Sequence, residues 1–275
     1  MTTFQAILQA IVHCVFELLP IGGAMTGVQL LSHALSWQAP SECFEGVLLF
    51  VGAFALFFYF RHDWASIISN LLRVLVYRKF PSSLDERLSL FITMSAIPPL
   101  LAHTYLQPFI PEFLKTPLGT AIMILLGALP LWFGQRFSRK NRGMFDWNPL
   151  DAFLIGVGQA FYIFPGMGRQ TGALVFGLFR NYNLESLMKY IFLAATPLMA
   201  GRAFAKLHGF EFLSSEPVEN MSWLSVGAAG VVSFASYLLL LGAISKQAQA
   251  KEDSRGILIR VLLGISAAAW FWFKS

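Results

Sequence analysis

The chain has 275 residues, of which 56% are hydrophobic and 13% are charged, and its mean hydropathy is +0.61. Soluble domains carry about 25% charged residues, so this composition excludes an ordinary soluble domain and indicates an integral membrane protein. The net charge of +5 does not indicate nucleic-acid binding, because the basic residues lie in loops between apolar runs, where they set membrane topology.

Six apolar runs are long enough, or nearly long enough, to cross a bilayer as helices. They cover residues 44–60, 88–106, 118–135, 188–206, 222–244 and 256–273. The two cysteines, Cys14 and Cys43, have no metal-site spacing and are too few for a disulfide framework. We therefore expect one all-α membrane domain over residues 1–275 with about six transmembrane helices.

The basic residues orient these helices. They cluster in the loops after the first, third and fifth runs, whereas the segment 209–221 contains glutamates and no Lys or Arg. By the positive-inside rule the three basic loops are cytoplasmic, and the acidic segment and both termini lie outside. The segment 64–79 is predicted to form an interfacial helix on the cytoplasmic face.

Two further apolar stretches, 4–36 and 148–180, are too long for one simple span, and each is interrupted in its middle. The interruptions read "PIGGAMTG" at 20–27 and "PGMGRQTG" at 165–172, and they align without a gap as P-x-x-G-x-x-T-G. The first span, shifted by the same 145 residues, falls on the fourth. This predicts an internal repeat, with one copy at about 1–140 and the other at about 145–275.

Topology gives the two broken stretches opposite directions. The first stretch precedes a span that runs from outside to inside, and the second follows a cytoplasmic loop, so they enter the membrane from opposite faces. Two similar re-entrant helical hairpins in this arrangement form an inverted-topology repeat, and such interrupted helices indicate a binding site near the midplane. Irregular backbone at that depth persists only inside protein or beside a cavity.

Ionisable side chains within the two hairpins are candidates for function, because a buried charge without a partner is costly. The first hairpin contains His13 and Glu17, spaced i,i+4 on one helix face, and the second contains Arg169. If the hairpin tips meet, Glu17 and Arg169 come close together. The Arg fork suits phosphate oxygens, glycine-rich backbone N–H groups form anion cradles, and Thr26 and Thr171 add hydroxyl donors.

Structural roles for the same residues stay open. Glu17 and Arg169 could form only a buried ion pair that locks the hairpins together, and His13 could be a hydrogen-bonded core residue. Thr26 and Thr171 could only cap helices. The glycines could serve close helix packing, and Glu45, in the first span, is interpreted as structural.

These motifs resemble those of the bacterial undecaprenyl pyrophosphate phosphatase family. The first family motif, roughly E-G-x-x-E-F-L-P-V-S-S-T-G-H, is similar to "HCVFELLPIGGAMT" at 13–26, and the second, P-G-x-S-R-S-G-A-T, is similar to "PGMGRQTGA" at 165–173. Further matches extend the resemblance over nearly the whole length. They are "FEGVLLFVGA" at 44–53, "SAIPPLL" at 95–101, "DAFLIGVGQAF" at 151–161 and "FLAATPLMAG" at 192–201.

The resemblance implies a bacterial inner-membrane protein with an inverted repeat that removes the terminal phosphate of undecaprenyl pyrophosphate, which regenerates the lipid carrier for envelope polymers. It also implies a site of paired glutamates, a serine, a histidine and an arginine, with a divalent cation, Mg²⁺ or Ca²⁺. Glu17 matches the second glutamate and Arg169 the arginine. The other motif positions depart: the first glutamate is His13, the serines are Gly22, Gly23 and Gly168, the threonine is Ala24, and the histidine is Thr26.

From these residues we expect Arg169 to clamp a polyprenyl phosphate headgroup and Glu17 to orient it or couple protons. Thr26 and Thr171 would donate hydrogen bonds, and Gly22, Gly23, Gly168 and Gln170 would complete the headgroup site. Three functions stay open: hydrolysis through water activated by Glu17 or His13, transport of the lipid phosphate across the membrane, and a catalytically inactive regulatory or scaffold subunit. Oligomeric state does not follow from the sequence.

Overall fold

The protein is helical throughout the part that the structure describes. The computed structural model describes residues 1–77, 84–208, 222–249, 261–262 and 264–266. Within these residues there is no β-strand, and the only β-type pairing is an isolated bridge between Arg142 and Tyr182. An all-α fold is therefore confirmed for the described chain.

The helices follow one another with short connections. They are α1 (Thr3–Leu18), α2 (Ala24–Ala34), α3 (Glu42–Tyr59), α4 (Arg61–Tyr77), α5 (Leu84–Leu101), the π-helical turn η1 (Ala102–Leu106), η2 (Gln107–Phe109), α6 (Glu112–Lys115), α7 (Pro117–Phe137), η3 (Met144–Asp146), α8 (Pro149–Ala160), η4 (Phe161–Ile163), α9 (Arg169–Phe179), α10 (Leu184–Leu207) and α11 (Trp223–Gln249). Helices α3, α5, α7, α10 and α11 coincide with five of the six predicted apolar runs. The acidic segment 209–221 and most of the run 256–273 lie outside the described residues.

Among the described residues, four stretches are long and apolar enough to cross a membrane: Glu42–Tyr59, Glu86–Phe109, Pro117–Phe137 and Trp223–Ala248. The second of these stretches continues α5 through the π-helical turn η1. This turn follows just after Pro98 and Pro99, because prolines inside a helix interrupt its hydrogen-bond ladder. Helix α10 has 24 residues but is not among the four. These helices indicate a multi-pass membrane protein.

Helix α3 shows how the exterior suits lipid. Its side chains Phe50, Phe54, Phe57 and Phe58 are 41–58% exposed, whereas Phe44 and Leu49 on its other side are fully buried. Four exposed phenylalanines on one helix form an apolar face that a soluble monomer rarely presents to water. Helix α4 forms where the segment 64–79 was predicted to be helical, and its interfacial position stays a prediction.

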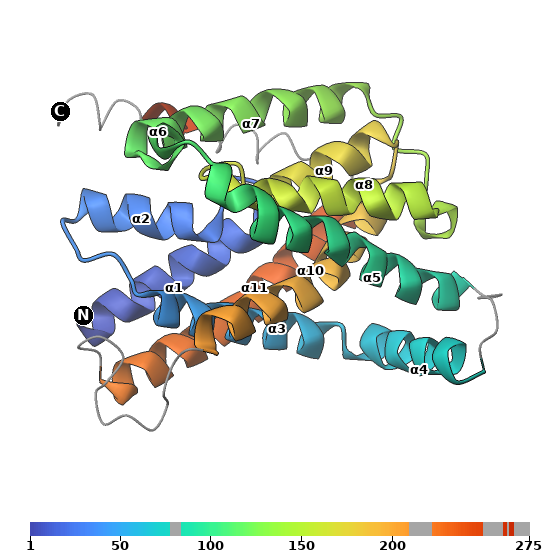
Figure 1. Cartoon of the computed structure of the whole chain (residues 1–275), viewed down its shortest axis with the longest axis horizontal. Helices are drawn as coiled ribbons and strands as arrows, with labels where there is room; N and C mark the ends of the chain where they lie inside the picture. Colours follow the sequence, from blue (N-terminus) through green and yellow to red (C-terminus); the bar gives the residue numbers. More distant parts are fainter. Residues whose placement is uncertain (78–83, 209–221, 250–260, 263, 267–275) are drawn as a thin grey trace.

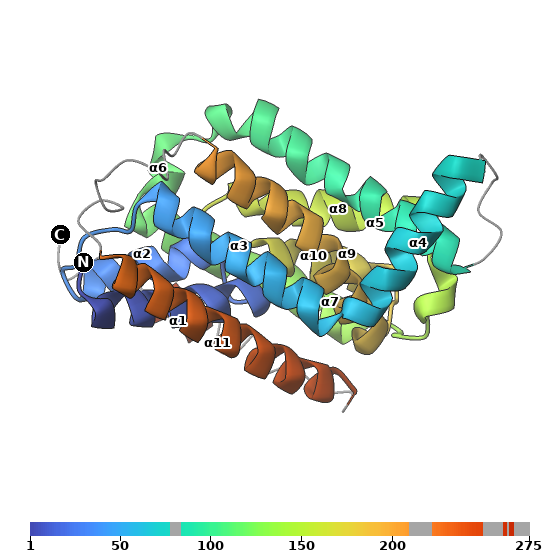
Figure 2. The same ribbon diagram turned by 90° about the horizontal axis from the view of Figure 1, so that it is seen from below.

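The two broken stretches form two helical hairpins that approach each other from opposite ends of the molecule. Helices α1 and α2 extend inward from one end, and α8 and α9 extend inward from the other, so that their breaks meet near the middle (Figure 1). Helices α3 and α10 pack along each other, and Figure 2 shows them next to each other. Helix α1 packs on α11, and α8 packs on α5.

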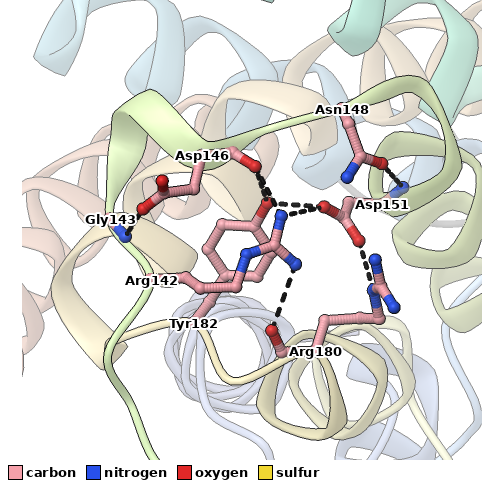
Figure 3. Close-up of polar contacts among 7 residues, drawn as sticks. All are labelled: Arg142, Gly143, Asp146, Asn148, Asp151, Arg180 and Tyr182. Carbon is pink, nitrogen blue, oxygen red and sulfur yellow. Dashed lines mark hydrogen bonds and ion pairs between the residues drawn. The ribbon is translucent and has the colours of Figure 1, made fainter.

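The outer end of the second hairpin is fixed by a charged cluster around Asp151 (Figure 3). The fully buried Asp151 carboxylate accepts hydrogen bonds from Arg142 Nη2 at 2.6 Å, from the Tyr182 hydroxyl at 2.7 Å and from Arg180 Nε. Burial raises the pKa of Asp151, but these three hydrogen bonds outweigh it and hold the pKa below its ordinary value. The cluster joins the α7–α8 and α9–α10 connections, and so it anchors both helices of this hairpin.

Neutral hydrogen bonds hold the outer end of the first hairpin. Thr3 Oγ1 lies 2.8 Å from Ser225 Oγ of α11, and Gln9 Nε2 donates to Ser32 Oγ at 3.2 Å. The outer supports of the two hairpins therefore differ chemically although the hairpins share their central motif.

Candidate functional site

The two hairpin breaks touch each other in the middle of the molecule. The Gly166 N–H donates to Thr26 Oγ1 at 3.0 Å, which ties the second break to the first turn of α2. Gly168 lies directly against Gly22, since a Cβ on Gly168 would come within 2.2 Å of the Gly22 carbonyl oxygen. The tips therefore meet through backbone, at a distance that only glycine permits.

Glu17 and Arg169 form an ion pair at this junction, as predicted. Arg169 Nε donates to Glu17 Oε1 at 3.0 Å, and Arg169 Nη2 lies 3.4 Å from the Glu17 carbonyl oxygen. The side chains are 2% and 4% exposed, for Arg169 and Glu17 respectively. Glu17 lies in the last turn of α1, just before the first break, and Arg169 begins α9 within the second break.

One part of the Arg169 fork is left without an acceptor. Its Nη1 is buried and has no hydrogen-bond partner among the described residues. A buried donor without an acceptor costs about 1–3 kcal/mol, and more when the group is charged. The geometry therefore favours an additional acceptor beside Nη1, and an anionic oxygen is the acceptor that a guanidinium binds most strongly.

Arg169 lines a cavity of about 140 Å³. The lining residues are Glu17, Gly23, Ala24, Met25, Thr26, Gln29, Tyr162, Ile163, Pro165, Arg169 and Arg202. Sites for drug-sized ligands span about 300–1,000 Å³, so this cavity suits a compact polar group rather than a whole lipid.

The first turn of α2 forms one wall of this cavity. Gly23 is the N-cap of α2 and Gly168 is the N-cap of α9, and neither helix has a side-chain cap. Uncapped N-terminal N–H groups and the positive end of the helix dipole together favour an anion. The first turn of α2 therefore offers these N–H groups to the cavity, whereas α9 contributes Arg169 to the lining, and anion binding by the predicted glycine cradle stays a prediction.

Arg202 of α10 also faces the cavity, and sequence reasoning did not select it. Its guanidinium carbon lies 4.6 Å from the centre of the Tyr162 ring, and its Nη2 donates to Glu45 Oε1 at 3.2 Å. Glu45 also pairs with Lys206 Nζ at 3.0 Å. A charged residue in the predicted span 188–206 was the available signal, because ionisable groups at membrane depth are functional candidates by default.

Several predicted site residues do not line the cavity: His13, Gly22, Gly168, Gln170 and Thr171. His13 is fully buried one turn before Glu17, and neither of its ring nitrogens has a hydrogen-bond partner among the described residues. Gln170 Nε2 contacts Met188 Sδ at 3.4 Å, and Thr171 is buried. Direct contact of these five residues with a ligand stays a prediction.

Two of the three glycines at family serine positions, Gly23 and Gly168, differ in what they could accommodate. Gly168 has a φ of +76°, where a residue with a side chain is strained. Gly23 has an ordinary φ of −86°, and a Cβ there would meet Thr26 Oγ1 at 3.5 Å, an ordinary contact. A serine therefore fits at Gly23 and not at Gly168 with this backbone.

The donor set also bears on the divalent cation that the resemblance implies. Among the described residues there is no group of three or more His, Cys, Asp or Glu side chains that could hold a metal ion. Glu17 is the only carboxylate of the lining, and it is already paired with Arg169. Mg²⁺ is often held by one or two carboxylates together with substrate phosphates, so a cation here would depend on phosphate oxygens, and its binding stays a prediction.

Comparison with known proteins agrees with the motifs. The family model described as bacitracin resistance protein BacA matches residues 6–265. An undecaprenyl-diphosphatase of Moorella thermoacetica is 28% identical over 274 residues, which cover 100% of both chains. Undecaprenyl-diphosphatases of Gemmatimonas aurantiaca and Idiomarina loihiensis are each 26% identical, over 96% of this chain and over 96% and 97% of their own lengths. Because the family model covers nearly the whole chain, this protein belongs to the BacA family of bacitracin resistance proteins.

Proposed function

We propose that the protein binds the phosphate headgroup of undecaprenyl diphosphate or undecaprenyl phosphate in the cavity between the two hairpin tips. The observation that carries this proposal is the buried Arg169 Nη1, which has no acceptor in the part of the chain that the structure describes and belongs to a residue of the cavity wall. The uncapped first turn of α2 and the Thr26 hydroxyl supply further donors. The relatives' name, undecaprenyl-diphosphatase, supports this choice of lipid.

The proposed architecture is an inverted-topology repeat of two re-entrant hairpins in the bacterial inner membrane, with both termini outside. The 145-residue offset carries Ala24–Ala34 onto Arg169–Phe179, which are the bounds of α2 and α9. The same offset places α5 within α11, and the packing is exchanged accordingly, since α1 packs on α11 while α8 packs on α5. A pseudo-two-fold axis between α3 and α10 accounts for this exchange.

Hydrolysis of undecaprenyl diphosphate is the reaction that we propose first, because the relatives carry its name. The described residues of the cavity lining include no Ser, Cys, His or Asp, and their side-chain hydroxyls belong to Thr26 and Tyr162. Phosphoryl transfer depends mainly on positioning and on stabilising charge, which Arg169 and the α2 N-terminus provide. In this reading Glu17 orients a water molecule that attacks the terminal phosphorus, and the bond from that phosphorus to the bridging oxygen breaks. The products are undecaprenyl phosphate and inorganic phosphate; one hydrogen of the water stays on the inorganic phosphate and the other is released as a proton.

Transport of the lipid phosphate across the membrane is the second candidate. The same lack of a serine or histidine nucleophile in the lining favours it, together with the exchanged packing, because inverted repeats support alternating access to a central site. In this reading the protein binds and releases the headgroup without chemistry. The two candidates share the site and differ in whether phosphate is released.

Phosphate release tests the first candidate. Purified protein in detergent, with undecaprenyl diphosphate and Mg²⁺ or Ca²⁺, should release phosphate, and Arg169→Ala should lower the rate by at least about 100-fold, as expected for loss of a charge-stabilising group. Arg169→Lys should also be impaired, because lysine lacks the planar fork. Equal release by wild type and Arg169→Ala would exclude hydrolysis at this site.

Leaflet exchange tests the second candidate. A labelled undecaprenyl phosphate is placed in one leaflet of proteoliposomes, and its arrival in the other leaflet is measured. Transport predicts faster exchange with wild type than with Arg169→Ala or empty liposomes. Equal exchange in all three samples would exclude transport.

A further inference from the structure

We propose that Arg202 is a second phosphate ligand of the same cavity, and that it makes the site prefer a diphosphate headgroup over a monophosphate. This inference rests on the proposed function and adds a specificity residue to it. Among the described residues that line the cavity, Arg169 and Arg202 are the two with cationic side chains, whereas Glu17 is the single carboxylate. The two guanidinium groups come from different elements, the tip of the second hairpin and helix α10.

Two contacts hold the Arg202 side chain at the cavity wall. The Tyr162 ring lies under its guanidinium at 4.6 Å, and Glu45 binds its Nη2 at 3.2 Å. A cation placed over an aromatic ring and anchored by a carboxylate is fixed before a ligand arrives. The Arg202 side chain is 15% exposed, so a ligand can reach it more readily than the Arg169 side chain, which is 2% exposed and is reached through the cavity.

The charges around Arg202 leave a surplus for an anion. Glu45 is shared, because its Oε1 binds Arg202 and its Oε2 binds Lys206 Nζ at 3.0 Å. The buried carboxylates Glu17 and Glu45 thus face three cations, Arg169, Arg202 and Lys206. A third carboxylate, Glu42, lies 3.7 Å from Lys206 Nζ but is 87% exposed, so water screens its charge and the buried part of the group keeps an excess of positive charge. A monophosphate can be bound by the Arg169 fork alone, whereas a diphosphate presents a second phosphate that matches a second guanidinium.

Arg202 thereby supplies positive charge to the cavity directly. A bound metal ion could supply the same charge only weakly, because the described lining of the cavity has a single carboxylate to hold it. A divalent cation needs several oxygen ligands, and the lining offers one carboxylate, whereas a guanidinium needs none. The preference for diphosphate should therefore persist when divalent cations are chelated.

Affinity measurements on matched variants test this inference. The probes are undecaprenyl methylenediphosphonate, which is not hydrolysed, undecaprenyl phosphate and inorganic pyrophosphate, each titrated in detergent with EDTA. Arg202→Gln should weaken diphosphonate binding by at least about tenfold, which is the loss of one charge-assisted contact, and monophosphate binding by less than threefold. Inorganic pyrophosphate should lose as much as the diphosphonate, because the contact is with the headgroup.

Lys206→Gln is the matched control. It removes one positive charge one helical turn after Arg202, at a residue that does not line the cavity. It should change each affinity by less than threefold. A second variant keeps the test independent of folding defects in the Arg202 variant: Tyr162→Ala removes the ring under the Arg202 guanidinium and should lose part of the diphosphate preference.

The outcomes separate the two proposals. If wild type binds none of the lipid probes, the proposed function fails. If wild type binds them and Arg202→Gln weakens diphosphonate and monophosphate equally, the proposed function stands and the role of Arg202 is wrong. Equal losses for Arg202→Gln and Lys206→Gln would likewise overturn that role, since they would reflect general charge only.

Discussion

Replacing Glu17 by glutamine should destabilise the protein strongly and make it more responsive to a phosphate ligand. The change removes one charge of a pair whose side chains are 2% and 4% exposed, and it leaves the Arg169 guanidinium buried without its counter-charge. Breaking a buried pair in this way costs about 3–5 kcal/mol. The new amide oxygen can still accept from Arg169 Nε, so we expect the lower end of that range.

SDS-titration unfolding in mixed micelles measures this cost. Glu42→Gln is the control for the chemical change, because Glu42 is 87% exposed and its pair with Lys206 spans 3.7 Å, so no measurable loss of stability is expected. The double variant Glu17→Gln/Arg169→Gln should lose less than the sum of the single variants, since both charges are then absent.

The ligand response distinguishes a binding site from a purely structural lock. In Glu17→Gln the anion becomes the only counter-charge for Arg169, so undecaprenyl methylenediphosphonate should stabilise this variant more than wild type at the same concentration. A cost below about 1 kcal/mol for Glu17→Gln would contradict the reasoning, because Arg169 would then be hydrated rather than buried. An equal ligand response in wild type and variant would show that Arg169 does not contact the anion.

Three further predictions concern the glycine positions, the Asp151 cluster and metal binding. Gly23→Ser should fold as stably as wild type, because serine is a favoured N-cap, whereas Gly168→Ser should lose about 1–3 kcal/mol through its positive φ and its approach to Gly22; SDS titration compares them. Wild type should lose stability as pH falls below the ordinary Asp151 pKa of 3.8. The pKa of Asp151 is lowered in the folded state, so its carboxylate stabilises that state fully above pH 3.8 and loses this contribution as the pH falls through the folded pKa. Asp151→Asn should lack this contribution of Asp151 to acid unfolding. Ca²⁺ titrated calorimetrically should show no strong binding without a phosphate ligand, since Glu17 is the only carboxylate of the lining, and tight binding of Ca²⁺ alone would contradict this donor count.

The length of the apolar runs was sufficient to predict the long helices. Runs such as 118–135 must be helical at membrane depth, because every backbone polar group has to be paired within its own segment, and α7 (Pro117–Phe137) follows that run closely. The match of two eight-residue interruptions predicted that distant segments would meet, and the ion pair of Glu17 with Arg169 confirms this contact. Both predictions depend on short patterns that a sequence displays directly.

The composition of the cavity was not predictable from the same patterns. Arg202 reaches the site because α10 packs along α3 and brings its side chain over Tyr162, and a crossing of this kind leaves no trace in local spacing. Thr26 and Thr171 occupy equivalent motif positions, yet only Thr26 lines the cavity. An internal repeat predicts similar backbone, whereas the side chains on either side of the break decide which copy faces the ligand.

This asymmetry bears on the choice between chemistry and transport. A site that binds a headgroup equally from both faces would be expected to use its two motif copies alike, but here α2 lines the cavity with its first turn and α9 contributes mainly Arg169. The outer ends differ as well, since the second hairpin is held by the buried Asp151 with two arginines and the first by neutral hydrogen bonds. If the hairpins move during function, the weaker support favours movement of α1 and α2 relative to an anchored α8 and α9. Arg169, at the start of the anchored α9, would then hold the headgroup while α2 moves away from it. This motion can admit a substrate for hydrolysis. It becomes transport only if the second hairpin, α8 and α9, also moves.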